Sequence, residues 1–231
     1  MIEKYFRDGI RFKWNAPAAL HQPMDGSVVD NTGTTSPMIY DGLESQLIDP
    51  HLRIFNVSTI GLTMRMHIQH VWLDYSLGRT SKCPIGPYDI LTGFMSGCFI
   101  VRWTDRGVRY VGHVGTIDKA QPTATLVNKT VKSTFARAMT ADAQGFNPAA
   151  AWSFEEVQTK ARLFRRSPDP KIIALVTTSG QFYSILMLKL QADPQEPSIQ
   201  LGRDWCVAGL KTVQPMNRDA LYMEMRKLSD S

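Results

Sequence analysis

The fold is decided by residues 97–114, which read GCFIVRWTDRGVRYVGHV. Two runs rich in β-branched and aromatic residues, 97–103 and 108–114, flank the turn-forming tripeptide Asp105-Arg106-Gly107. A tight turn containing glycine between two such runs is typical of a β-hairpin. We therefore expect residues 97–114 to form two antiparallel strands that pair directly with each other.

The register of this hairpin decides which side chains meet. A turn centred on Asp105 and Arg106 places Cys98 directly opposite His113, and directly opposed residues on one face have Cβ atoms roughly 4.5–5.5 Å apart. That spacing brings a thiol and an imidazole within hydrogen-bonding reach. A bulge with Gly107 in the left-handed conformation would shift the register by one residue and leave the pair oblique or on opposite faces. The interpretation of the pair depends on this register.

The pattern outside the hairpin predicts more strands than helices. Strands are expected at 54–60, 63–73, 171–177, 181–190 and 205–213, and helices at 127–142, 150–166 and 218–228. The helix at 150–166 has the capping-box spacing of Ser153 and Glu156, and its apolar face holds Phe154, Val157, Ala161 and Phe164. Because several strands are hairpin-linked, the fold class is α+β, a layered, sandwich-like domain with mixed, largely antiparallel β-sheets flanked by helices.

The length and composition predict a single domain over residues 1–231, since a chain with 43% hydrophobic residues can bury a sizeable core. Residues 15–51 are rich in Pro, Gly, Ser, Thr, Asn and Asp, so we expect residues 1–52 to form an irregular segment packed on that domain. Residues 1–14 mix charged with apolar side chains and lack the apolar core of a signal peptide. No stretch approaches the roughly 18–20 apolar residues of a membrane-spanning helix. Localisation stays open, with export by a specialised secretion system into a target cell as one route.

The charge balance constrains the partners. Lys and Arg number 26 against 21 Asp and Glu, a net charge of +5 that favours anionic partners without resembling a nucleic-acid-binding tail. We expect no nucleic acid and no membrane as partner, and a monomer. A run of cations at the end of the 150–166 helix complements the helix dipole and does not predict a phosphate site.

The three cysteines, Cys83, Cys98 and Cys206, have no spacing typical of a disulfide framework or a structural zinc site. His67 and His70 are three apart on an expected strand, so their side chains point to opposite faces and do not predict a metal pair. We expect no metal and no cofactor. Reduced thiols are the simplest interpretation, with Cys83 and Cys206 as structural residues.

Cys98 and His113 carry the chemistry if they meet. A thiolate is a strong nucleophile, and an adjacent imidazole lowers the thiol pKa and carries a proton to the leaving group. Gly97 allows a substrate carboxamide to approach the backbone, and the N–H groups around Cys98 are placed to stabilise an oxyanion. The alternative is that Cys98 is a small buried hydrophobic residue and His113 a hydrogen-bonded structural one, as most such residues are.

The segment Thr92-Gly93-Phe94-Met95-Ser96-Gly97-Cys98, followed by His113, resembles the cysteine deamidase superfamily of Burkholderia lethal factor, the cytotoxic necrotizing factors and the bacterial chemoreceptor deamidases. The hallmark of that superfamily is a Leu-Ser-Gly-Cys motif with a downstream His, and here Met95 replaces Leu. Thr92 stands where some members place the Thr of a Thr-Cys-His triad. The resemblance covers residues 88–116 only.

The resemblance implies a bacterial toxin or effector in which Cys98 attacks a glutamine carboxamide of a protein target, with a host protein as one candidate. His113 is implied as proton donor to the departing ammonia, Thr92 as the residue that orients the imidazole, and Ser96 and Gly97 as support for the oxyanion. Proteolysis and transglutamination pass through the same thioester and remain open. A non-catalytic basic binding module, with Cys98 as a core residue, is the third interpretation.

Overall fold

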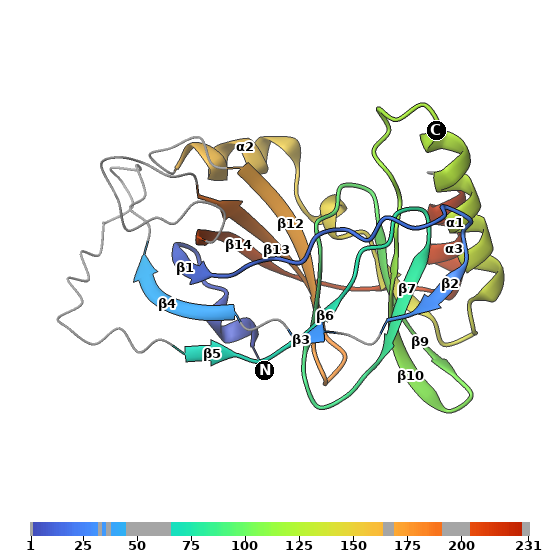
Figure 1. The fold of residues 1–231 in the computed structure, drawn as a ribbon, viewed down its shortest axis with the longest axis horizontal. Helices are drawn as coiled ribbons and strands as arrows, with labels where there is room; N and C mark the ends of the chain where they lie inside the picture. The colour runs from blue at the N-terminus through green and yellow to red at the C-terminus, as the bar shows by residue number, and fades with distance from the viewer. Residues whose placement is uncertain are drawn as a thin grey trace.

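The computed structural model describes residues 2–31, 34–35, 38–44, 66–163, 169–190 and 204–227. Within these ranges the chain forms two β-sheets, largely antiparallel, and three α-helices (Figure 1). The prediction of an α+β fold with mixed, sandwich-like sheets flanked by helices is confirmed.

The larger sheet has nine strands among the described residues. Its strand order is β3 (Thr34–Thr35), β6 (Val71–Leu73), β8 (Ile90–Gly93), β12 (Asp169–Val176), β13 (Phe182–Lys189), β14 (Asp204–Val213), β1 (Ile10–Lys13), β4 (Met38–Glu44) and β5 (Met66–Ile68). Strands β12, β13 and β14 are its antiparallel centre, and β6 pairs with β8 in parallel. The β12–β13 turn passes through Gly180, whose φ of 86° is a conformation that glycine adopts readily.

The smaller sheet has six strands in the same described part of the chain. Its order is β15 (Met216–Asn217), β11 (Gln144–Phe146), β9 (Phe99–Asp105), β10 (Val108–Val114), β7 (Thr80–Pro84) and β2 (Val28–Asp30). The predicted hairpin of residues 97–114 is therefore the centre of this sheet.

The helices occupy two places. Helices α1 (Ala124–Ala138) and α3 (Arg218–Lys227) cover the outer face of the smaller sheet, where Phe99, Val101 and Trp103 pack against them. Helix α2 (Phe154–Arg162) lies against the larger sheet and follows a 3-10 helix at Pro148–Ala151; another short 3-10 helix spans Glu3–Tyr5 (Figure 1).

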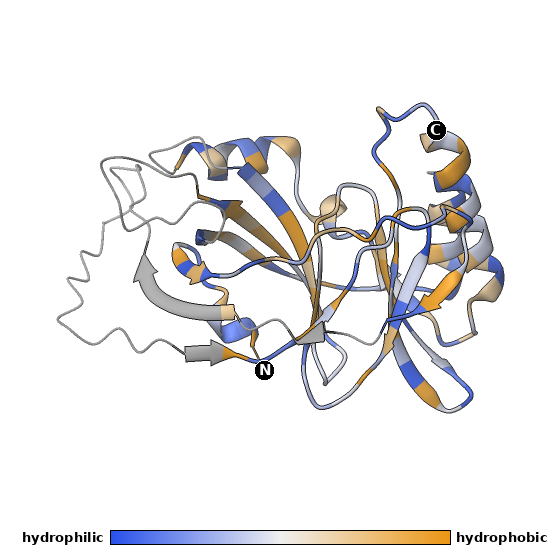
Figure 2. Ribbon diagram, viewed as in Figure 1, coloured by the Kyte–Doolittle hydropathy of each residue, from blue (hydrophilic) through white to orange (hydrophobic). Residues whose placement is uncertain are grey.

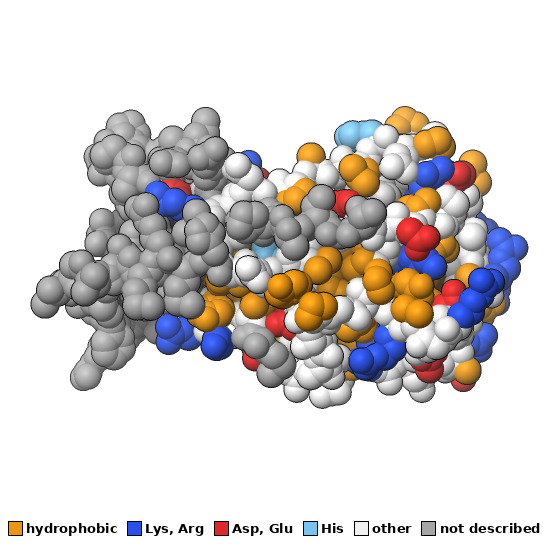
Figure 3. Space-filling model, turned by 60° about the horizontal axis from the view of Figure 1, so that its bottom comes forward, with side chains coloured by type: hydrophobic (Ala, Val, Ile, Leu, Met, Phe, Trp, Pro, Cys, Tyr) orange, Lys and Arg blue, Asp and Glu red, His pale blue; other side chains and the backbone are white. Residues whose placement is uncertain are grey.

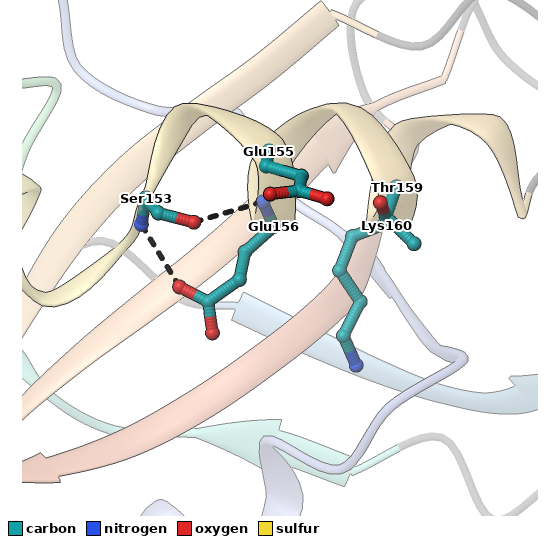
Figure 4. Close-up of a pocket in the computed structure, with 5 residues that line it drawn as sticks. All are labelled: Ser153, Glu155, Glu156, Thr159 and Lys160. Carbon is teal, nitrogen blue, oxygen red and sulfur yellow. Dashed lines mark hydrogen bonds between the residues drawn. The ribbon is translucent and has the colours of Figure 1, made fainter.

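Helix α2 confirms the predicted capping box but begins later than expected. Ser153 Oγ accepts from the Glu156 backbone N–H, and the Glu156 carboxylate accepts from the Ser153 N–H (Figure 4). The helix therefore starts at Phe154, and the residues before Trp152 form a 3-10 turn instead. The apolar face is only partly buried, since 81% of Phe154 is exposed. The end of the expected helix, 164–166, lies outside the described residues.

One face of the larger sheet has two different covers. On strand β13, Phe182 packs into the layer between the two sheets, whereas Leu186 and Leu188 pack against the segment of Trp152 and α2. Figure 2 shows that β12 is hydrophilic at its outer end and hydrophobic where it reaches the middle of the molecule. The smaller sheet and the α2 segment thus cover different parts of this face of the larger sheet. We call the boundary between these two covers the seam.

The predicted register of the hairpin is wrong. Arg106 and Gly107 both have positive φ, 48° and 79°, so they form a two-residue turn with Asp105 facing Val108. His113 consequently lies opposite Ile100 and not opposite Cys98. Because the partner of each residue changes by two positions, side chains keep their faces, and Cys98 and His113 still point into the layer between the sheets.

Two further expectations are corrected. The segment expected to be irregular, residues 1–52, contributes strands β1 to β4, and β1 lies within the larger sheet between β14 and β4. Residues 66–73 form two separate strands, β5 and β6, which lie far apart in the strand order instead of forming one strand. The strand expected at 54–60 lies outside the described residues.

Candidate functional site

A cavity of about 460 Å³ opens at the seam between the smaller sheet and α2. It lies where the loop after β8, the segment after β10, the 3-10 turn with α2, and strands β12 and β13 come together. Its lining residues are Tyr75, Phe94, Met95, Ser96, Cys98, Thr116, Asp118, Ala149, Val157, Pro170, Lys171, Ile172 and Leu186.

Cys98 stands immediately before β9, where the hairpin ladder begins. Its side chain is only 2% exposed, yet it lines the cavity. Its Sγ lies 3.4 Å from Thr116 Oγ1 and 3.9 Å from the Thr116 carbonyl oxygen. Of the three cysteines, Cys98 is the one that lines this cavity, so it is the thiol within reach of a small molecule or side chain.

His113 is fully buried on the same face of the hairpin, one diagonal step from Cys98. Diagonal neighbours in a ladder have Cβ atoms less than about 7–8 Å apart, within the reach of two side chains that turn toward each other. The Cys98 thiol is hydrogen-bonded to Thr116 and not to His113. Among the described residues, His113 Nε2 has no hydrogen-bond partner.

Thr92 fixes the tautomer of His113. Thr92 Oγ1 donates to the Leu73 carbonyl at 2.7 Å and lies 2.6 Å from His113 Nδ1. A hydroxyl has a single proton, and Leu73 O only accepts, so Nδ1–H is the donor to Thr92. Nε2 therefore carries the free lone pair and is the nitrogen able to act as a base.

Tyr75 and Thr116 join the thiol to the imidazole. The Tyr75 ring stacks on His113 with centroids 5.0 Å apart and an interplanar angle of 15°. Its hydroxyl donates to the same Thr116 carbonyl that approaches Cys98 Sγ. Tyr75 also lines the cavity, so it separates one face of the imidazole from the open space.

Burial sets the protonation states. Burial raises the pKa of Cys98, against the opposing effects of hydrogen bonds from Thr116 and Gly97 and the positive charge of Lys132. Burial also lowers the pKa of His113 to about 3. At neutral pH the pair is therefore a thiol and a neutral imidazole, and the thiol has to lose its proton during attack instead of before it.

Ser96 and Gly97 lie beside the thiol as expected. Ser96 lines the cavity with an exposed side chain, and a Cβ on Gly97 would meet only Thr116 Oγ1 at 3.5 Å. The loop they belong to is held by the Met95 N–H, which donates to the Ile172 carbonyl at 3.2 Å. The backbone next to Cys98 is thus open to a ligand.

The other candidate residues and pockets do not belong to this cavity. His70 is buried beside Trp14, with Nδ1 3.3 Å from the Ile68 carbonyl, and is away from the cavity. The hollow of about 230 Å³ beside Ser153, Glu156 and Lys160 is a surface feature of α2, where Ser153 and Glu156 form the capping box (Figure 4). The described part of the chain has no group of three or more His, Cys, Asp or Glu side chains that could hold a metal ion. No described helix is long and apolar enough to cross a membrane.

The charged side chains are unevenly distributed over the face drawn in Figure 3. Figure 3 shows hydrophobic side chains across the middle of one face and Lys and Arg gathered toward the end that holds the smaller sheet. Several cations are paired with carboxylates, among them Lys82 with Asp30 and Arg79 with Asp25.

Two residues of the site, Tyr75 and Thr116, were missed from the sequence. Thr116 follows His113 by three positions, and Tyr75 lies in the connection between β6 and β7, where no motif or periodicity marks it. Their role follows from the tertiary contacts alone.

Comparisons with known proteins add no relative. No protein-family model, no curated protein and no solved structure matches the chain.

Proposed function

We propose that the chain is a cysteine-dependent protein-glutamine deamidase with Cys98 as nucleophile, His113 as base and Thr92 as the residue that orients the imidazole. One observation carries the proposal. A cavity-lining thiol shares a sheet face with a buried histidine whose Nδ1–H is fixed by Thr92 and whose Nε2 is free. The short resemblance of residues 92–98 and 113 to the cysteine deamidases supports the reaction class.

The first half of the reaction forms a thioester. When the carboxamide enters, Cys98 Sγ leaves Thr116 and turns toward His113 Nε2, which accepts the thiol proton as sulfur bonds to the amide carbon. Catalytic hydrogen bonds of this kind often form only in the substrate complex. His113 then gives the proton to the nitrogen, the carbon–nitrogen bond breaks, and ammonia leaves.

The second half consumes water. His113 Nε2 accepts a proton from the water molecule as its oxygen attacks the thioester carbonyl. The carbon–sulfur bond breaks, the proton returns to sulfur, and a glutamate side chain is released. In this proposal the backbone N–H groups around Gly97 donate to the oxyanion of both tetrahedral intermediates.

The neutral forms of Cys98 and His113 agree with a mechanism in which proton transfer follows substrate binding. A thiol and a neutral imidazole in a buried site avoid the cost of two buried charges until the substrate is bound. The fate of the thioester distinguishes deamidation from transglutamination, because water gives glutamate and an amine gives a new amide.

The test incubates wild-type protein and Cys98→Ser with a eukaryotic cell lysate, since the resemblance is to toxins that act on host proteins. Mass spectrometry then reads glutamine side chains that gain about 1 Da on conversion to glutamate. We expect a small set of converted sites with the wild type and none with Cys98→Ser. Conversion that persists in the variant would refute Cys98 as nucleophile, and new isopeptide bonds or cleaved chains would replace deamidation by transglutamination or proteolysis.

A further inference from the structure

The cavity has two chemically different sides. The side around Cys98 has the polar groups of Ser96, Thr116 and Asp118 beside the side chains of Tyr75, Phe94 and Met95. The other side is mainly apolar: it is formed by Ala149, Val157, Pro170, Ile172 and Leu186, with Lys171 as its one charged residue. The two sides adjoin, since the Met95 N–H of the Cys98 loop bonds to the Ile172 carbonyl.

The apolar side is part of a hydrophobic cluster that is left partly open. Leu186 is fully buried at its base, and Val157 and Ile172 pack against the same cluster but remain partly accessible. Accessible apolar groups at the wall of a cavity gain free energy when a ligand covers them. The site therefore has a preference for an apolar group beside the amide.

The size of the cavity also supports binding of a second group beside the amide. A volume of about 460 Å³ is in the range of pockets that enclose a drug-sized ligand, and it exceeds what one glutamine side chain fills. The remaining space is next to the apolar side, so it suits a neighbouring side chain of the substrate.

The charges argue against free glutamine. The free amino acid would bring its carboxylate into the cavity, where burial against apolar groups is costly unless the charge is paired. The Lys171 ammonium, the cation of the cavity lining, is already 3.0 Å from the Asp169 carboxylate. A residue within a peptide chain carries no such charges.

We propose that the apolar side of the cavity binds a bulky apolar residue next to the target glutamine. The substrate class is then a glutamine in a peptide chain with an aliphatic or aromatic neighbour, and not free glutamine. This inference rests on the proposed function, because the carboxamide has to reach Cys98.

The test uses two nonapeptides with a central glutamine that differ only in its two neighbours, both Leu or both Ser, together with free L-glutamine. Ammonia release gives kcat/KM for the wild type, and fluorescence anisotropy of labelled peptides gives Kd for Cys98→Ala. We expect the Leu peptide to exceed the Ser peptide by about tenfold or more in both quantities, as expected for one buried aliphatic side chain. Free glutamine should be the poorest substrate.

A charge on the apolar side should remove this preference. Val157→Asp places a carboxylate in the wall of the cavity, and we expect the two peptides to become nearly equal. Phe154→Asp is the matched control, since it puts the same charge on the same helix at a position that is 81% exposed and outside the cavity lining. It should keep the preference, and circular dichroism of both variants checks that they fold.

Equal values for the two peptides, free glutamine as the best substrate, or a preference that survives Val157→Asp would overturn the inference. Failure of the proposed function has a different signature. In that case the Leu peptide still binds Cys98→Ala more tightly, but no Cys98-dependent ammonia release occurs with the wild type. Conversion of both peptides at equal rates would overturn the apolar recognition alone.

Discussion

Cys98 and Cys83 belong to the same apolar layer between the two sheets, and each is 2% exposed, yet their surroundings differ. Cys83 lies within strand β7, and burial together with the charge of Asp74 raises its pKa to about 12. Cys98 stands at the end of the ladder, lines the cavity, and has hydrogen bonds that oppose the effect of burial. The two thiols are therefore equally buried, but only Cys98 lines the cavity at the seam, where a substrate can reach it.

The comparison predicts the largest effect for the two thiols themselves. Cys98→Ser should lower kcat/KM for glutamine conversion by at least about 10³-fold, since the loss of a nucleophile removes the covalent route. Cys83→Ser, a matched change in the same layer, should stay within a few-fold of the wild type once its folded fraction is measured by circular dichroism. Similar losses in both variants would show that packing, and not nucleophilicity, explains the result.

The comparison extends to His70 and His113, the two buried histidines among the described residues. Asn mimics the Nδ1 donor of histidine but has nothing at Nε2, so His113→Asn keeps a donor toward Thr92 and loses the base. We expect a loss of about 10²-fold or more in kcat for this variant. His70→Asn, which keeps the donor toward Ile68, should retain activity. Steady-state ammonia release measures both, and an active His113→Asn would remove His113 from the mechanism.

Stability should not distinguish the same two histidines. Burial lowers the pKa of His113 to about 3 and that of His70 to about 4, from an ordinary value of 6.5. The unfolded chain therefore binds more protons between these limits, and stability falls as the pH falls from about 6.5 toward 4. Each histidine contributes up to about 1.4 kcal/mol per pH unit to the free energy of unfolding.

Urea unfolding at pH 7, 6 and 5 measures this slope. His113→Asn and His70→Asn should each reduce it by a similar amount, although only the first loses activity. A slope unchanged by either substitution would mean that the imidazole is not buried in its neutral form.

The smallest effect on catalysis is expected at Thr92. Thr92→Val keeps the shape but removes the hydroxyl that accepts from His113 Nδ1, so we expect about a tenfold loss in kcat with little change in KM. Thr92→Ser keeps the hydroxyl and should recover most of the rate. If Ser and Val behave alike at this position, the hydroxyl does not orient the base.

Local patterns predicted the three helices, the long strands β9, β10, β12, β13 and β14, and one part of the site. The strand predicted at 181–190 and the capping box at Ser153 come from local signals, and each is found in the structure. The hairpin register was missed because Asp105-Arg106-Gly107 accommodates more than one turn, and the positive φ of Arg106 cannot be recognised from an arginine.

The strands of residues 1–52 and the Tyr75–Thr116 connection were missed for a related reason. Strand β1 pairs with β14, which is almost two hundred residues away in the chain, so its hydrogen bonds depend on a partner that no local window contains. Tyr75 reaches Thr116 and His113 in the same way, through a fold that brings distant segments together. In contrast, Thr92, Cys98 and His113 were predicted from a short motif, and the contact between Thr92 and His113 is present.

The most direct measurement is the rate at which iodoacetamide, itself a primary carboxamide, alkylates each cysteine of the folded protein. Peptide mapping by mass spectrometry at increasing times gives separate rates for Cys98, Cys83 and Cys206, in the wild type and in His113→Asn. The account predicts that Cys98 reacts at least about tenfold faster than the other two and that His113→Asn removes most of this advantage. Three similar rates, or a fast Cys98 unaffected by loss of the imidazole, would contradict the claim that Cys98 is a nucleophile activated by His113.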